Sequence, residues 1–375
     1  MQHWHSETTL SKTVLPYIHF FPEDAVFFDI ETTGFSHRHA MCYLIGCATR
    51  SGDTIAIDQF FATKKEEEKE IIATFLQFIH PYHTLITFNG NGFDIPFLTK
   101  RCEILELEQH LCDFSLRDIF KSLSALKNIL KLDNYKQKTI EAFLGISRED
   151  AYNGGELINI YYDYQKTESS SALALLKLHN YEDVLGMTEL LPVFSYINFF
   201  EGNFYVASLE KKEHDSSTEN SYLDMTFTLT SDFPFPKRIS YGIGDIYFTA
   251  SQNAAYFTVK IYSGELKYFY RNYQDYYYLP KEDMAIHKSV AFYVDKNYRT
   301  RAKAATCYSR KTSCFLPQYE SIITPYFKLE YQDKISYFEC TKNFYQSDDA
   351  VYQYCFHILQ HLLNFKKSTH APTLR

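Results

Sequence analysis

Glycine, proline and long apolar runs are scarce in this chain of 375 residues. The 13 glycines and 11 prolines amount to about half of the usual share, whereas aromatic residues make up 17% of the chain. A chain so rich in aromatic residues can bury large cores, which excludes extensive disorder, and its length suits about two domains. Because no run of 18 apolar residues occurs, we expect no transmembrane helix and no membrane partner.

Targeting signals and cysteine pairs are also missing. The N-terminal sequence MQHWHSETTLSK lacks the basic and apolar segments of a signal peptide, and the C-terminal HAPTLR carries no lipidation signal. None of the eight cysteines forms a CxxC pair, which argues against a zinc ribbon or a disulfide framework. We therefore expect reduced thiols and a cytoplasmic protein.

The formal net charge of −8 argues, as a single number, against a general binder of polyanions, because phosphate groups bind to clustered Lys and Arg. The charge is unevenly distributed, however. Residues 1–200 contain 17 basic and 27 acidic residues, whereas residues 201–375 contain 21 and 19. The excess of acid therefore belongs to the first part of the chain.

Residues 24–205 have the pattern of a mixed α/β domain, preceded by an N-terminal extension at 1–23. Apolar and β-branched runs predict strands at 25–30, 43–49, 54–60 and 84–88. Apolar residues at helical spacing predict helices at 63–79, over most of 93–143, and at 170–196.

A second domain is expected at 223–375. The most polar stretch, LEKKEHDSSTEN, predicts a linker, which we place at 206–222. Aromatic and β-branched residues between 241 and 279 predict antiparallel strands with a turn at Ser263-Gly264, and residues 351–365 predict a helix. We therefore expect an aromatic-rich α+β domain after the linker.

The first acidic motif is DIETTG, at residues 29–34. Alternate side chains of a strand share a face, so Asp29 and Glu31 point the same way from an otherwise apolar strand. Adjacent carboxylates repel each other and lose hydration unless a cation joins them, and oxygen ligands favour Mg²⁺ or Mn²⁺. On this motif alone, a metal site and a solvent-exposed strand end are both open.

The second motif, ITFNGNGFDIPFL, runs from a buried strand through a glycine-rich turn into a helix that begins near Asp94. The helix dipole is expected to keep Asp94 ionised, and the glycines leave room for the backbone of a ligand. Taken alone, it also fits an acid that complements the dipole in an ordinary loop.

The third motif is HNYED, inside a predicted helix. His179 and Asp183 are four residues apart and so lie on one helical face, where Asp183 can bind a metal and His179 can orient or deprotonate a water. An exposed pair that shares a proton is the ordinary alternative.

Together, FFDIETTG, LITFNGNGFDIPFL and LHNYEDVLGM resemble the DEDD exonuclease group of the ribonuclease-H-like superfamily, and they are most similar to the predicted 3′–5′ exonucleases of the YprB type. The resemblance covers roughly residues 24–198. It implies a ribonuclease-H-like mixed sheet flanked by helices and a 3′–5′ exonuclease acting on single-stranded DNA or RNA by a two-metal mechanism. It also implies a general base at His179 and ligands for two Mg²⁺ or Mn²⁺ ions at Asp29, Glu31, Asp94 and Asp183.

One departure concerns the base. The histidine branch of this group places its base five residues before the last aspartate, and the tyrosine branch places Tyr four before it. Here a histidine, His179, stands four residues before Asp183, so both base geometries stay open. Tyr181 is a weaker candidate, because it lies on another helical face.

The second domain contains a basic segment, at residues 296–311, with six basic residues, no acid and two interleaved tyrosines. Basic groups neutralise phosphates and exposed rings stack on bases, so a footprint for single-stranded nucleic acid and a solvated basic loop are equally open. The candidate nucleic-acid contacts of the chain are Asn89, Asn91, Lys296, Arg299, Arg301 and Lys303.

Two further functions stay open. One is a catalytically silent scaffold that keeps the nuclease fold, which the presence of all four acids and the histidine disfavours. The other is an endonuclease of the same superfamily. The choice between DNA and RNA, the oligomeric state and the cellular pathway are open as well.

Overall fold

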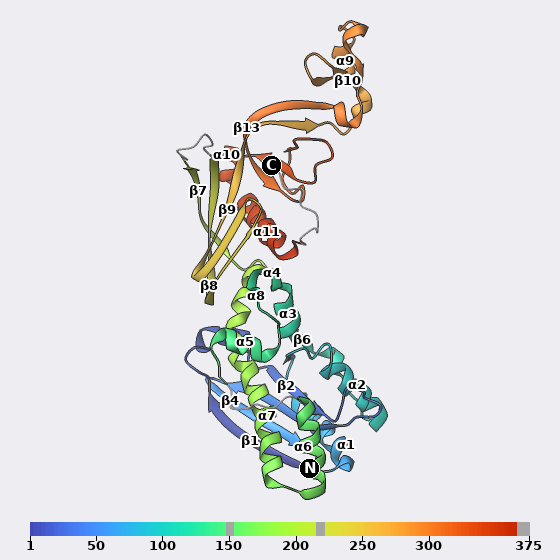
Figure 1. Ribbon diagram of the computed structural model, residues 1–375, viewed down its shortest axis with the longest axis vertical. Coiled ribbons are helices and arrows are strands. Elements are labelled where there is room, and N and C mark those ends of the chain that lie inside the picture. Colours follow the sequence, from blue (N-terminus) through green and yellow to red (C-terminus); the bar gives the residue numbers. More distant parts are fainter. Residues whose placement is uncertain (148–153, 215–221, 366–375) are drawn as a thin grey trace. The chain divides into compact units, whose positions relative to one another are not determined.

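The computed structural model describes residues 1–147, 154–214 and 222–365 (Figure 1). The chain divides into two compact units. Unit 1 comprises residues 1–198 and 233–237, and unit 2 comprises residues 199–232 and those from 238 onwards. Among the described residues, no helix is both long enough and apolar enough to cross a membrane.

Unit 1 is built on a six-stranded mixed sheet of order β1-β4-β3-β2-β5-β6. Neighbours from β1 to β2 pair antiparallel, whereas β5 is parallel to β2 and β6 is parallel to β5. The strands are β1 Gln2–Thr9, β2 Ala25–Thr32, β3 Cys42–Ser51, β4 Thr54–Phe61, β5 Thr84–Thr87 and β6 Ser115–Asp118. The predicted mixed α/β class is confirmed.

Helices cover both faces of this sheet. Phe28 of β2 points toward α1, where its ring lies 5.1 Å from that of Phe75. The next residue, Asp29, points to the opposite face and contacts α7. The helices are α1 Glu68–Ile79, α2 Asp94–Leu105, α3 Ile119–Ala125, α4 Lys127–Leu130, α5 Gln137–Leu144, α6 Gly154–Thr167, α7 Ser170–Glu189 and α8 Phe194–Phe200. The short 3₁₀ turns of this part are Leu15–Phe20, Lys65–Glu67, Leu111–Asp113 and Leu191–Val193.

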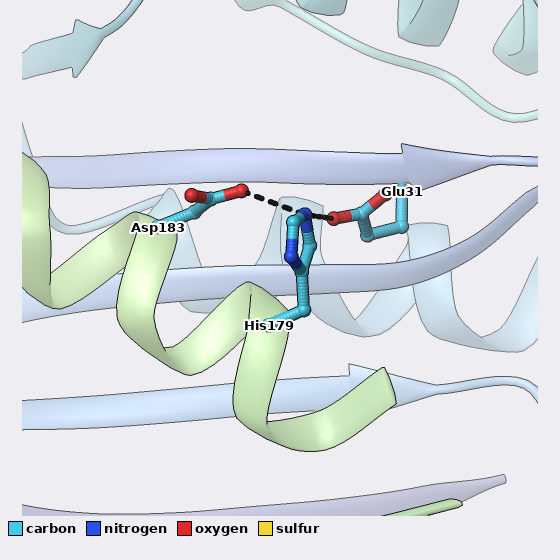
Figure 2. A group of neighbouring side chains, drawn as sticks. All are labelled: Glu31, His179 and Asp183. Atoms are coloured by element: carbon cyan, nitrogen blue, oxygen red, sulfur yellow. Dashed lines mark ion pairs between the residues drawn. The ribbon is translucent and has the colours of Figure 1, made fainter. Parts of the chain in front are cut away.

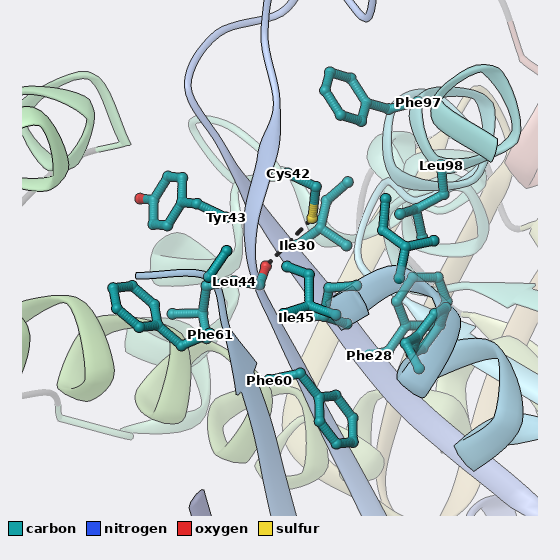
Figure 3. Close-up of a cluster of buried hydrophobic side chains, with 14 of the residues drawn as sticks. Phe28, Ile30, Cys42, Tyr43, Leu44, Ile45, Phe60, Phe61, Phe97 and Leu98 are labelled. Atoms are coloured by element: carbon teal, nitrogen blue, oxygen red, sulfur yellow. Dashed lines mark hydrogen bonds between the residues drawn. The ribbon is translucent and has the colours of Figure 1, made fainter. Parts of the chain in front are cut away.

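The main core of unit 1 surrounds the central strands (Figure 3). Residues 42–49 of β3 are buried without interruption, as in a strand that is covered on both faces. Phe97 and Leu98 of α2 pack against the same cluster. The run of buried residues at the start of β2 ends at Asp29, where the candidate site begins.

The predicted N-terminal extension is wrong as a separate segment. All of β1 pairs with β4, from Gln2 opposite Phe61 to Thr9 opposite Thr54. Trp4 stacks on the ring of Phe61, which explains why a polar segment joins the sheet as its edge strand.

Unit 2 contains a six-stranded sheet of order β14-β15-β13-β9-β8-β7 and a three-stranded sheet of order β11-β10-β12. Helix α11 packs on the larger sheet through Tyr354, whose ring lies 5.4 Å from Phe227 and 5.2 Å from Phe338. The strands are β7 Tyr205–His214, β8 Tyr222–Ile243, β9 Ile246–Phe269, β10 Tyr276–Leu279, β11 Met284–His287, β12 Thr300–Arg301, β13 Tyr308–Gln318, β14 Tyr326–Phe327 and β15 Ser336–Glu339. The helices are α9 Lys288–Ala291, α10 Lys342–Tyr345 and α11 Asp348–Asn364, with 3₁₀ turns at Tyr273–Asp275, Lys296–Tyr298 and Ala304–Thr306.

Two predictions for this part are wrong. Residues 206–214 of the predicted linker belong to β7, which pairs with β8, and 215–221 lie outside the described residues. This segment is polar because most of its side chains are exposed on an edge strand. The predicted turn at Ser263-Gly264 is part of β9, opposite Cys314 and Ser313 of β13, whereas the chain turns at Gly244, where φ is +53°. The helix predicted at 351–365 is confirmed as α11.

A buried ion pair joins α1 and α2. Both guanidinium nitrogens of Arg101 that face Glu68 donate to its carboxylate, whose Oε1 also accepts from the backbone amide of Cys42 at 2.8 Å. Arg101 further donates to the carbonyl of His37 at 2.9 Å. The pair therefore fixes both helices and the loop after β2.

Replacing Arg101 with Met leaves the Glu68 charge buried without its partner, so the free energy of unfolding should fall by about 3–5 kcal/mol. The double variant Glu68→Gln/Arg101→Met should regain part of this loss. The side-chain oxygen of the new glutamine can still accept from the backbone amide of Cys42, and no charge is buried. Urea unfolding measures both effects. The exposed Lys100→Met is the control, and an Arg101→Met protein as stable as that control contradicts this account.

Candidate active site

The carboxylates of β2 meet α7 where β3 has no side chain. Gly46 of β3 lies opposite Asp29, and a Cβ at this position would collide with the side chain of Asn180. Asn180 donates from Nδ2 to Asp29 Oδ2 at 3.3 Å, and its Oδ1 accepts from Gln59 Nε2 at 2.9 Å. These two hydrogen bonds, from Gln59 to Asn180 and from Asn180 to Asp29, fix the orientation of the Asp29 carboxylate.

A histidine on α7 lies between two acids (Figure 2). Nε2 of His179 is 3.1 Å from Asp183 Oδ2 and 3.4 Å from Glu31 Oε1. His179 is buried, whereas Glu31 and Asp183 keep partial access to solvent. One ligand atom from each residue lies within 4.8 Å of those of the other two, so the group is compact enough to hold one metal ion.

Asp94 joins this site from the first turn of α2. Its Oδ1 accepts from the backbone amide of Ile30, between the two acids of β2, at 3.2 Å. The preceding loop is fixed by Asp118, whose carboxylate accepts from the amides of Asn89 and Asn91 at 3.0 and 3.1 Å. Asp118 thus has a structural role, because it holds the loop that precedes Asp94.

Burial and mutual repulsion dominate the electrostatics. Burial, followed by the charges of Asp94, Asp183 and Glu31, holds the pKa of Asp29 well above its ordinary value, although the hydrogen bond from Asn180 opposes this. Burial raises the pKa of Asp94 to about 7, against the amide of Ile30. Desolvation therefore opposes the ionisation of Asp94 that the helix dipole favours.

The residues present fit a divalent cation. A cation placed among Glu31, His179 and Asp183 meets two carboxylates and one imidazole, and its charge relieves the repulsion that acts on Asp29. The carboxylate donors suit Mg²⁺ or Mn²⁺. Tyr181, the weaker candidate for the base, is not part of this group.

The remaining predicted contact residues lie in different places. Asn89 and Asn91 are exposed in the loop before Asp94. Four basic candidates surround the three-stranded sheet of unit 2, namely Lys296, Arg299, Arg301 and Lys303. The last two basic residues of the predicted patch lie in β13 and pair with acids, Arg310 with Glu265 at 3.4 Å and Lys311 with Glu339 at 2.6 Å. The basic surface is therefore smaller than the sequence segment.

Sequence reasoning missed the residues that support the acids. Asn180 stands within the HNYED motif, directly after His179, and Gln59 interrupts the apolar end of a predicted strand. A buried amide at either position signals a polar partner on a neighbouring element, but the strand and helix patterns do not say which one.

Similarity to known proteins agrees with this architecture. Residues 26–194, somewhat less than half of the chain, match the family model of the RNase_H superfamily. The mixed sheet with its flanking helices is therefore a ribonuclease-H-like fold, and the match supports a nuclease. No curated protein matches the chain.

Three solved structures resemble the chain weakly. The family B DNA polymerase of Pyrobaculum calidifontis has 14% identity and a TM-score of 0.37, over 65% of this chain and 33% of its own. Escherichia coli exonuclease I in complex with a dT13 oligonucleotide has 11% identity and a TM-score of 0.32, over 55% and 54%. A product-bound exonuclease I has 10% identity and a TM-score of 0.30, over 55% and 58%. The chain thus spans between a third and three fifths of the length of these proteins.

Replacing Asp29 with Asn should stabilise the metal-free protein, because it removes one of the repelling charges and keeps an acceptor for Asn180. A raised carboxylate pKa favours the folded state at low pH, and this contribution is lost as the pH rises toward the folded-state pKa. The gain in melting temperature from Asp29→Asn should therefore grow as the pH rises above about 4, the ordinary pKa of an Asp, by roughly 2–4 °C per kcal/mol of relieved repulsion.

Thermal unfolding in EDTA and in Mg²⁺ measures this effect. Mg²⁺ should raise the melting temperature of the wild type more than that of Asp29→Asn. The exposed Asp113→Asn serves as the control, and the same pH-dependent gain in both variants would contradict a local repulsion at the site.

Proposed function

We propose that this protein is a metal-dependent nuclease that hydrolyses phosphodiester bonds, as a 3′–5′ exonuclease on single-stranded nucleic acid. One observation carries the proposal: within a ribonuclease-H-like sheet, Glu31 of β2 and Asp183 of α7 flank a buried histidine, and Asp29 is close enough to feel their charges and that of Asp94. The acids are Asp29, Glu31, Asp94 and Asp183. Polarity and the single-stranded substrate rest on the resemblance of the three motifs.

Each acid has a distinct setting for this role. Glu31 and Asp183 would hold one cation together with, or beside, His179. Asp29, oriented by Asn180, would hold metal together with these residues, and Asp94, fixed by the amide of Ile30, would act mainly at a second ion. When bound, Mg²⁺ or Mn²⁺ ions neutralise phosphate charge and make a bound water more acidic.

His179 would receive the proton of the attacking water. Its Nε2 points into the group of acids, and Glu31 and Asp183 on either side stabilise the imidazolium that forms. The same nitrogen would be a metal ligand if an ion occupied the centre of the three residues. If His179 is a metal ligand, loss of its imidazole weakens metal binding. If it is the general base, metal binding stays largely intact.

Two variants separate these roles. Asp183→Asn should abolish hydrolysis and weaken Mn²⁺ binding, whereas His179→Ala should leave Mn²⁺ binding largely intact and lower turnover by about 10²–10⁴-fold, as the loss of a general base does. Calorimetric titration with Mn²⁺ and assays on an end-labelled oligonucleotide measure the two properties. Asp113→Asn is the matched control, and a His179→Ala protein that no longer binds Mn²⁺ makes His179 a ligand instead of the base.

Other modes on the same site give different products. An exonuclease releases mononucleotides and cannot begin on a circular strand, whereas an endonuclease linearises the circle. A silent scaffold releases nothing at any metal concentration. Parallel DNA and RNA substrates identify the sugar.

We also keep the cytoplasm as the proposed location of this protein, because all eight cysteines are unpaired.

A further inference from the structure

An exposed aromatic pair stands on unit 2, directly after the short helix α9. Phe292 is 76% exposed and Tyr293 is 86% exposed, and their rings meet edge to face at 5.5 Å. Val290, on α9 itself, is 57% exposed. Neither ring contributes to a core, so their aromatic character is not explained by packing within the chain.

A third ring, that of Tyr277 on β10, lies within 4.9 Å of two arginines. The guanidinium groups of Arg299 and Arg301 each lie 4.9 Å from the centre of the Tyr277 ring. Arg299 also donates to the carbonyl of Ala291, the residue before Phe292. Arg299 therefore links the Arg–Tyr–Arg group to the segment that carries the exposed pair. We call these residues together the tip surface: Tyr277, Phe292, Tyr293, Arg299 and Arg301.

The small sheet holds this surface in place. Tyr276 and Tyr278 alternate with Tyr277 along β10 and point to the other face, where Tyr276 stacks on Tyr270 at 4.6 Å. Arg301 pairs with Tyr277 across β10 and β12. One face of the sheet is thus packed, and the other presents Tyr277 and its arginines.

The charge of this region is mainly positive. Residues 286–303 contain five basic residues and one acid, Asp295, which accepts from the backbone amide of Asn297. Lys288 is engaged by Asp275 at 2.7 Å, whereas Lys296 and Lys303 are exposed near the arginines. A ligand that complements the tip surface is therefore anionic and has flat faces that can stack.

We infer that the tip surface binds single-stranded nucleic acid, with bases stacked on Phe292 and Tyr293 and phosphates held by Arg299 and Arg301. The choice of ligand rests on the proposed nuclease function. A lipid surface fits less well, because α9 has only four residues and offers no amphipathic face. A second copy of the tip surface fits less well too, because its positive charge repels itself.

Binding in EDTA separates this inference from catalysis. The full-length double variant Phe292→Ser/Tyr293→Ser should bind labelled oligothymidylate about 10–100-fold more weakly by fluorescence anisotropy, because stacking on both rings is lost. Arg301→Gln should reduce the slope of log K against log salt by about 0.7, the value for one phosphate on a single strand. Matched controls are Tyr247→Ser/Tyr256→Ser, which removes exposed rings of β9, and Lys342→Gln, which removes an exposed charge.

Hydrolysis of bis(p-nitrophenyl) phosphate in Mn²⁺ tests the acidic site alone. This small ester has one phosphate and no nucleobase, so it does not need the tip surface in order to bind. Equal rates for wild type and tip variants, together with weaker oligonucleotide binding, support the inference. Unchanged binding, or equal weakening in the controls, overturns it. Binding to phosphatidylserine vesicles in place of the oligonucleotide also overturns it. Oligonucleotide binding that depends on the tip surface, without any ester hydrolysis, supports nucleic-acid binding by the tip surface and contradicts the proposed nuclease function.

Discussion

Repulsion among carboxylates at the end of β2 is the constraint around which unit 1 is arranged. Asp29 feels the charges of Asp94, Asp183 and Glu31 at once, in a setting that burial has deprived of most water. The fold holds these groups together nevertheless, through the amide of Ile30 and the side chain of Asn180. Glu31, His179 and Asp183 lie close enough together to hold one cation, whose positive charge would relieve this repulsion.

Several residues outside the site position the segments that carry its acids. Gly46 permits α7 to approach β3, and Asp118 ties the loop that leads to Asp94. The ion pair of Glu68 and Arg101 joins the two helices on the other face of the sheet. Each holds a segment that carries a site residue, so their effect on activity would come through position.

Local periodicity predicted much of this from the sequence. Alternation places Asp29 and Glu31 on one face, and the four-residue interval brings His179 and Asp183 to 3.1 Å. Long-range partners were not predictable in this way, because Gln59 and Asn180, or Glu68 and Arg101, meet only in the folded chain. Edge strands were missed for a related reason: β1 and β7 bury few side chains, so their apolar signal is weak. The split of charge along the chain does correspond to structure, with the acids of the site in unit 1 and the tip surface in unit 2.

We propose that the acids of unit 1 hydrolyse phosphodiester bonds with divalent metal ions. Incubating the wild-type chain with an end-labelled single strand, in Mg²⁺, in Mn²⁺ and in EDTA, tests it most directly when the products are sized at single-nucleotide resolution. A metal-dependent 3′–5′ exonuclease shortens the strand stepwise from the 3′ end in either metal and leaves it intact in EDTA. An intact strand under all three conditions, or equal cleavage in EDTA, would contradict it.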